Sequence, residues 1–135
     1  MGYSIYKKTQ IQGCSKFQLI GKCLDKASEH MQKVIDATKQ EKYEDVSIFS
    51  EKIFEILGTL RANIILQDGL PANDPAKVLD IYYHDNMILL RRMTQNKDIA
   101  LGEQLKSSFK EMANTWRIVD AAHKDIGVDG PSDNL

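Results

Sequence analysis

Apolar side chains recur at steps of three and four residues along most of the chain, a spacing that places them on one face of an α-helix and excludes a strand. The clearest stretch is 44–66, and its stripe consists of Val46, Phe49, Ile53, Ile56, Leu60 and Ile64. Phe54, Leu57 and Ile65 widen this stripe. Because so broad an apolar face needs partners on more than one side, we interpret 44–66 as the inner helix of a bundle.

The first helix is predicted to begin near Lys16. Ser15 can act as its N-cap, and Gln18 follows at the capping-box spacing. The helix is expected to end near Thr38, and its apolar stripe consists of Ile20, Leu24, Ala27, Met31 and Val34. A short polar connection then leads to 44–66, as expected between antiparallel neighbours in a bundle.

The central helix is predicted to stop near Gln67, because a turn and Pro71 come next. Asp74 and Pro75 have the order of an N-cap and a first helical residue, so the third helix is predicted to start there. Asp98 is the predicted cap of the fourth helix. The stripe of that helix consists of Leu101, Leu105, Phe109, Met112, Trp116 and Val119.

The third helix carries more apolar residues than one face can hold. They are Val78, Leu79, Ile81, Tyr82, Tyr83, Met87, Ile88, Leu89, Leu90 and Met93. Such a set covers more than one side of the helix, so part of it is expected either to be enclosed by the core or to form a surface for a partner. Core burial is the favoured interpretation.

Together these segments predict an all-α fold, an antiparallel (up-down-up-down) four-helix bundle with an N-terminal arm. We expect residues 1–14 to form a flexible arm, because no helical or strand period holds there. Residues 15–123 are expected to form the bundle. Residues 124–135 are expected to be a disordered tail, since they contain Gly127, Gly130 and Pro131.

The chain has 135 residues, 42% of them hydrophobic and 27% charged, which suits one globular domain with a sizeable core. Its formal net charge is -1, so no global basic field would attract nucleic acid or an anionic membrane. Neither a signal peptide nor a run of roughly 18 apolar residues is recognisable, so we expect no membrane insertion. Cys14 and Cys23 are too few for a disulfide framework and suit thiols in a cytoplasmic protein.

The sequence lacks the motifs of common catalytic and cofactor sites. A di-iron bundle needs a glutamate three residues before a histidine, and the residues at that spacing before the three histidines are Ala27, Ile81 and Asp120. We therefore predict no metal, no cofactor and no enzymatic activity. Phosphotransfer on His84 is a less favoured alternative, because the basic and glycine-rich neighbours that would hold a phosphoryl group are missing around it in the sequence.

Several short elements follow one another along the chain in a recognisable order. They are Tyr6, Ser15-Lys16-Phe17-Gln18-Leu19, Cys23-Leu24-Asp25-Lys26, Thr59-Leu60-Arg61-Ala62, Tyr83, Asp98 and Thr115-Trp116-Arg117. Their order and spacing resemble those of the FliS family of cytoplasmic flagellar secretion chaperones. Lys16, Leu24 and Lys26 stand where that family usually has proline, tyrosine and glycine.

The resemblance implies a cytoplasmic chaperone that binds the C-terminal helical segment of flagellin in hydrophobic grooves, prevents premature polymerisation and assists export. The flagellar export apparatus and a cochaperone would be further partners. The candidate partner-binding residues are Leu19, Ile20, Cys23, Ile53, Leu57, Tyr83, Met87 and Leu90, together with Tyr6 and Ile11 of the arm. The arm would cover the grooves when they are empty or contact the export machinery.

Two alternatives stay open from the sequence. Each candidate residue could instead be an ordinary core position. The client could also be another secreted or regulatory protein, with the chain acting as a chaperone or adaptor, for example as a FlaF-like regulator of flagellin.

Overall fold

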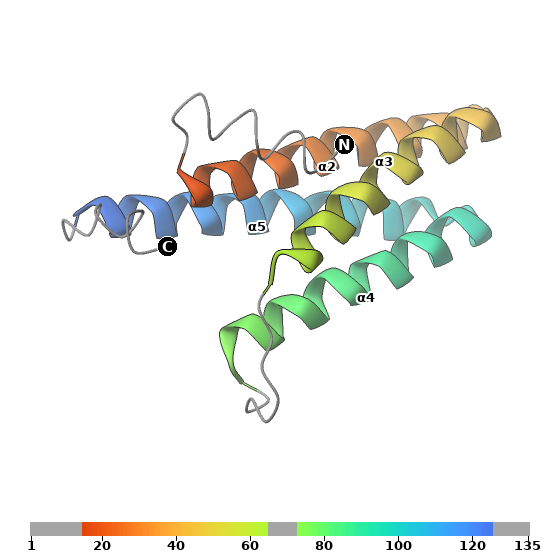
Figure 1. Cartoon of the computed structure of the whole chain (residues 1–135). Coiled ribbons are helices and arrows are strands. Elements are labelled where there is room, and N and C mark those ends of the chain that lie inside the picture. The colour runs from red at the N-terminus through yellow and green to blue at the C-terminus, as the bar shows by residue number, and fades with distance from the viewer. Residues whose placement is uncertain (1–14, 65–72, 126–135) are drawn as a thin grey trace.

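The structure, a computed structural model, describes residues 15–64 and 73–125 of the chain. These residues form four helices, which are α2 (Lys16–Lys39), α3 (Tyr43–Ala62), α4 (Pro75–Asn96) and α5 (Ile99–Asp125) (Figure 1). The predicted arm, with Tyr6 and Ile11, and most of the predicted tail lie outside the described residues.

The four helices pack as a ring in which each helix contacts two neighbours. α2 packs most extensively on α5 and next on α3, whereas α4 makes smaller contacts with α3 and α5. Figure 1 shows α3 and α4 running obliquely across the pair formed by α2 and α5. The predicted all-α antiparallel four-helix bundle is confirmed.

Three of the four helices begin at the caps that the sequence predicts. The Ser15 hydroxyl oxygen accepts a hydrogen bond from the Gln18 backbone N–H at 3.0 Å, and the Gln18 side chain accepts one from the Ser15 N–H at 3.2 Å. Asp74 accepts from the Ala76 N–H at 3.0 Å, with proline at the first helical position. Asp98 accepts from the Leu101 N–H at 3.0 Å. These bonds satisfy N–H groups that have no partner inside the helix.

α3 ends at Ala62, several residues before the predicted stop near Gln67. The Asn63 N–H donates to the carbonyl oxygens of Thr59 and Leu60, and its side-chain amide donates to Thr59 at 2.7 Å. A short asparagine side chain that bonds to the backbone in this way competes with continued helix, which explains the early end.

α2 is the most deeply buried helix, although the sequence pattern predicted that role for 44–66. Its side chains Leu24, Ala27, Met31, Val34 and Ile35 are fully buried and belong to one core cluster with residues of the other three helices. α2 takes the inner position because it is the helix that packs closely along both α3 and α5.

Candidate functional site

The outer side of α4 exposes large apolar side chains. Val78, Ile81 and Ile88 are 50%, 47% and 45% exposed, and we call them the outer α4 face. Ile81 and Ile88 each precede a buried residue, Tyr83 and Leu90, by two positions, which places them about 200° around the helix from the core. The favoured interpretation of core burial is therefore wrong for these three residues.

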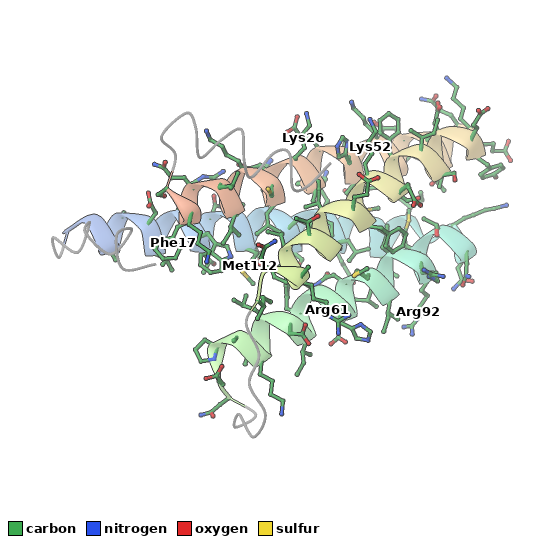
Figure 2. The ribbon with its side chains drawn as sticks, in the orientation of Figure 1. Phe17, Lys26, Lys52, Arg61, Arg92 and Met112 are labelled. Carbon is green, nitrogen blue, oxygen red and sulfur yellow. The ribbon has the colours of Figure 1, made fainter. Side chains whose placement is uncertain are left out.

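Aromatic side chains line the seam between α4 and α5. The Tyr82 hydroxyl donates to the Ser108 carbonyl oxygen at 3.1 Å, which fixes the ring against α5. Further along α5, the ring of Trp116 stacks on Phe17 of α2 with centroids 5.7 Å apart. Figure 2 shows Phe17 and Met112 beside α5. Tyr82 at this seam, and Met112 and Trp116 on α5, are all only partly buried, so α4 and α5 keep apolar surface accessible to a partner.

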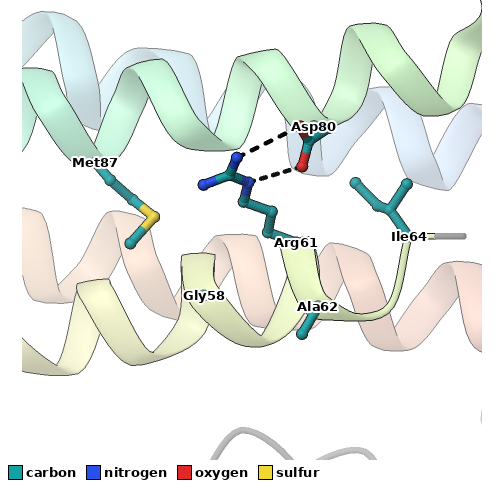
Figure 3. Close-up of a pocket in the computed structure, with 6 residues that line it drawn as sticks. All are labelled: Gly58, Arg61, Ala62, Ile64, Asp80 and Met87. Atoms are coloured by element: carbon teal, nitrogen blue, oxygen red, sulfur yellow. Dashed lines mark hydrogen bonds and ion pairs between the residues drawn. The ribbon is translucent and has the colours of Figure 1, made fainter. Parts of the chain in front are cut away.

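A shallow hollow of about 460 Å³ lies between α3 and α4 (Figure 3). It is lined by Gly58, Arg61, Ala62, Ile64, Asp80 and Met87. Since Met87 was predicted as a partner-binding residue and is only partly buried, it is the predicted site residue that the structure leaves most accessible among those it describes.

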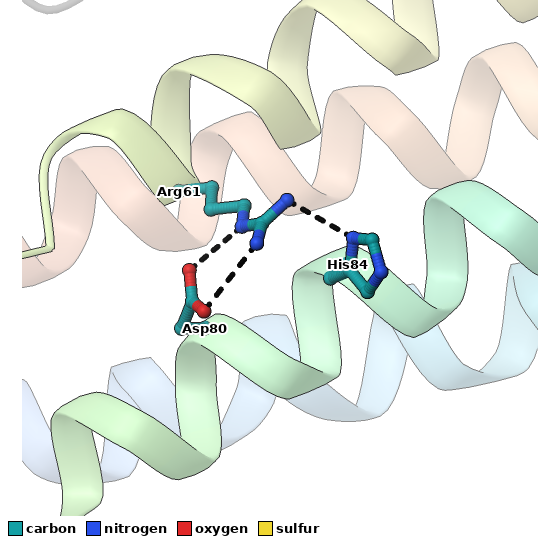
Figure 4. A network of polar contacts seen from close by, with 3 residues as sticks. All are labelled: Arg61, Asp80 and His84. Atoms are coloured by element: carbon teal, nitrogen blue, oxygen red, sulfur yellow. Dashed lines mark hydrogen bonds and ion pairs between the residues drawn. The ribbon is translucent and has the colours of Figure 1, made fainter.

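Arg61 connects α3 to α4 at the edge of this hollow (Figure 4). Its Nε donates to Asp80 Oδ1 at 2.7 Å and its Nη2 donates to Oδ2 at 3.5 Å, while Nη1 donates to Nδ1 of His84 at 3.0 Å. The hydrogen bond with Asp80 raises the pKa of Arg61 above its ordinary value. One basic group thus lies beside His84, although the sequence around this histidine predicted none.

Seven of the predicted partner-binding residues lie in the core. They are Leu19, Ile20, Cys23, Ile53, Leu57, Tyr83 and Leu90, and each is less than 9% exposed. The bundle brings them into one apolar cluster, so in this conformation they hold the helices together. Contact between them and a partner stays a prediction.

Burial also suppresses the chemistry of the two titratable groups in that set. It raises the pKa of the Cys23 thiol to about 11 and that of the Tyr83 hydroxyl to about 12. Both groups therefore stay protonated near neutral pH, and Cys23 is a free thiol that behaves as an apolar core side chain rather than a nucleophile.

The described residues offer little for other chemistry. Within them, no group of three or more histidine, cysteine, aspartate or glutamate side chains could hold a metal ion. None of the helices that the structure describes is long and apolar enough to cross a membrane. The accessible features are apolar and aromatic surfaces, which suit recognition of another protein chain.

Sequence reasoning did not select as site residues the outer α4 face or Arg61, Asp80 and His84, which we call the Arg61 cluster. A signal for the first existed, because Val78, Ile81 and Ile88 lie off the stripe that contains Tyr83 and Leu90. The Arg61 cluster joins residues from two helices, and such a meeting depends on how the helices pack rather than on local spacing.

Comparison with known families gives a match that covers most of the chain. The family model described as "Flagellar protein FliS" matches residues 1–123, a range that contains α2, α3, α4 and most of α5. Among curated proteins, no significant match to the chain is found.

Proposed function

The chain belongs to the FliS family of flagellar export chaperones, and we propose that it binds the C-terminal helical segment of flagellin in the bacterial cytosol. In this role it keeps flagellin from polymerising before export and delivers it to the export apparatus. The family is one of chaperones rather than enzymes.

The outer α4 face is the observation that carries this proposal. Val78, Ile81 and Ile88 lie within eleven residues, about 15 Å of helix axis. An amphipathic client helix can place apolar residues from successive turns against a surface of this length. Burying large side chains that are about half exposed in the free chain gives such a complex its driving force.

The α4–α5 seam extends the binding surface that we propose. α4 packs less on α5 than α2 does, so the contacts of α4 are the least costly for a client to rearrange. Movement of α4 would give a client access to the predicted site residues in the core, which are Leu19, Ile20, Cys23, Ile53, Leu57, Tyr83 and Leu90. We further propose that Tyr6 and Ile11 cover this surface in the absence of a client or contact the export apparatus.

The test is calorimetric titration of the full chain with a peptide of the flagellin C-terminal segment. A double variant, Ile81→Asp with Ile88→Asp, is expected to weaken binding at least about tenfold, because it places two charges where apolar side chains would be buried. Ile48→Asp is the matched control, since Ile48 on α3 has the same 45% exposure as Ile88. Its affinity for the peptide is expected to equal that of the wild type.

Equal loss of affinity in the double variant and the control would show that net charge rather than the outer α4 face governs binding. Full affinity in the double variant would move the site elsewhere. A folded wild-type chain that gives no heat with the flagellin peptide would overturn flagellin as the client and favour another secreted or regulatory protein.

A further inference from the structure

A second surface, on the α2–α3 seam, combines basic charge with a half-buried aromatic ring. Lys26, His30 and Lys33 lie at i, i+4 and i+7 on α2 and so share one side of that helix. Phe49 and Lys52 of α3 face them. The Phe49 ring stacks on His30 with centroids 5.9 Å apart, and the Nζ atoms of Lys33 and Lys52 lie 5.0 Å and 5.6 Å from its centroid.

We call Lys26, Lys33 and Lys52, together with Phe49, the lysine patch. All three lysines are exposed, and Figure 2 shows Lys26 and Lys52 on the same side of the molecule. Within 15–64 and 73–125, none of the three ammonium groups forms an ion pair with a carboxylate. Elsewhere in this part of the chain, ion pairs join Arg61 to Asp80, Lys106 to Glu103 and Arg117 to Asp25.

His30 lies beside these lysines and is buried. Its side chain is only 7% exposed, and its Nδ1 finds no hydrogen-bond partner among the described residues. Burial lowers the pKa of His30, and the charges of Lys26, Lys52 and Lys33 lower it further, while Glu29 acts in the opposite direction. A buried polar atom without a partner, beneath a positive surface, is a feature that calls for an explanation.

We propose that the lysine patch is a docking surface for an acidic segment of a partner protein, whose carboxylates pair with Lys26, Lys33 and Lys52 around the Phe49 ring. Lys26 and Lys33 are two helical turns apart, about 10 Å, which matches glutamates two turns apart on a partner helix. The half-buried Phe49 ring adds apolar contact beside the charged pairs, an arrangement typical of protein interfaces.

The surroundings of Phe49 favour a protein, rather than nucleic acid or lipid, as the partner of the lysine patch. The ring stacks on His30 and has two lysine ammonium groups near it, so it offers no free face for stacking a base. Three lysines without an inserted apolar side chain also attract a lipid surface only weakly.

The lysine patch lies away from the outer α4 face. In the ring, α2 and α4 each pack mainly on α3 and α5, so the α2–α3 seam and the α4–α5 seam lie on opposite sides of the bundle. An acidic partner and an apolar client could therefore be held at the same time. The acidic partner does not depend on the identity of that client.

The experiment measures binding of the full chain to an acetylated helical peptide with glutamates at i, i+4 and i+7 and a leucine between them. The variant K26E/K33E/K52E is expected to lose at least about tenfold in affinity, and raised salt is expected to weaken the wild-type complex. The matched control is K16E/K77E/K110E, which changes the net charge equally at exposed lysines outside the patch. It is expected to retain most of the affinity. K26Q/K33Q/K52Q removes the charges without reversing them and serves if the first variant unfolds.

The pKa of His30 provides a second readout, which would stay unchanged if the peptide bound elsewhere on the chain. Its titration is followed by the NMR signal of its ring proton with and without the glutamate peptide. Because docked carboxylates offset the charges of Lys26, Lys33 and Lys52, the pKa of His30 is expected to rise on binding.

Three results would overturn the proposal. Equal loss of affinity in patch and control variants would show a general charge effect. A peptide that binds without shifting the His30 titration lies elsewhere on the chain. A wild-type chain that ignores the peptide but binds phosphatidylglycerol vesicles or single-stranded RNA through these lysines would identify the partner as lipid or nucleic acid instead.

Discussion

α2 and α4 have similar lengths, 24 and 22 residues, yet the bundle buries them to very different extents. Thirteen residues of α2 are buried, against four of α4, which are Tyr83, Asn86, Leu90 and Met93. Both helices carry many apolar residues. Burial is therefore decided by how closely the neighbouring helices approach rather than by apolar content alone.

Small residues explain the closer approach to α2. A Cβ atom added to Gly21 would lie 3.4 Å from the Ala113 carbonyl oxygen of α5, and Ala27 is completely buried. The Ser28 hydroxyl donates to the Lys106 carbonyl oxygen at 3.3 Å, which also brings the backbone of α5 near. The corresponding side of α4 carries Tyr82 and other large side chains, so more apolar surface is left over for a partner.

The largest effect that tests this contrast is expected from Phe109→Ala. Phe109 is fully buried on α5, and its truncation is expected to lower the free energy of unfolding by about 3–5 kcal/mol through lost apolar burial and the cavity left behind. Ile88→Ala on the outer α4 face is the control and is expected to change that free energy by less than about 0.5 kcal/mol. Urea denaturation of both variants measures the difference. A similar cost for both would mean that the outer α4 face stabilises the fold.

Local spacing predicted the number of helices and the caps at Ser15, Asp74 and Asp98, because capping and amphipathicity are properties of neighbouring residues. It did not predict which apolar residues are covered. Leu57, a candidate partner-binding residue, is in the core, where its contact with a partner stays a prediction, whereas Ile81, for which core burial was favoured, is exposed.

That failure has a physical reason. A stripe shows which side of a helix is apolar, but coverage of that side depends on distance to the next helix, and distance is set by residues far away in the sequence. Lys33 and Lys52 meet at the Phe49 ring for the same reason, from two helices whose separate sequences give no sign of a shared patch.

A smaller effect is expected from Gly102→Leu, which tests where α4 is held tightly. A Cβ atom at Gly102 would lie 2.9 Å from Ile35 Cγ1 of α2 and 3.0 Å from Met93 Cε of α4. Filling this junction is expected to lower the free energy of unfolding by about 1–3 kcal/mol through overpacking.

Gly58→Ala is the matched control for that variant, since no atom outside its own helix lies within 4 Å of an added Cβ atom. Alanine is expected to stabilise α3 by about 0.5–1 kcal/mol through its higher helix propensity. Thermal denaturation in which Gly102→Leu lowers stability and Gly58→Ala raises it would support a tightly packed junction between α2, α4 and α5. A neutral or stabilising Gly102→Leu would show that this end of α4 is loose as well.

The next effect concerns the N-terminal end of α4. Asp74→Ala removes the side chain that accepts from the Ala76 N–H and is expected to lower the free energy of unfolding by about 1 kcal/mol. Because α4 has little packing, hydrogen exchange should accelerate mainly in its first turns. Ser15→Ala, by contrast, removes a hydroxyl that also donates to Asp120 at 2.7 Å. Hydrogen exchange should therefore accelerate in both α2 and α5. Exchange that stays unchanged in α4 would contradict the weak attachment of this helix.

The smallest effect is expected from the histidine that α2 buries. In the folded chain, burial and the neighbouring lysines lower the pKa of His30 below its ordinary value of 6.5. As the pH falls, His30 therefore takes up a proton in the unfolded chain before it does so in the folded chain. The contribution of uncharged His30 to the free energy of unfolding is therefore complete above about pH 6.5. It is lost as the pH falls from there through the lower folded pKa.

Replacing Lys26, Lys33 and Lys52 with glutamine should raise the folded pKa of His30 toward its unfolded value and flatten the dependence of stability on pH. Urea denaturation between about pH 5 and pH 7 measures this slope. Glutamine at Lys16, Lys77 and Lys110 is the control and should leave the slope as in the wild type. An equal change in both variants would attribute the slope to net charge. An unchanged slope in the patch variant would mean that burial of His30 alone lowers its pKa and that the lysines do not contribute. That result would strengthen the contrast between the enclosed α2 and the exposed α4.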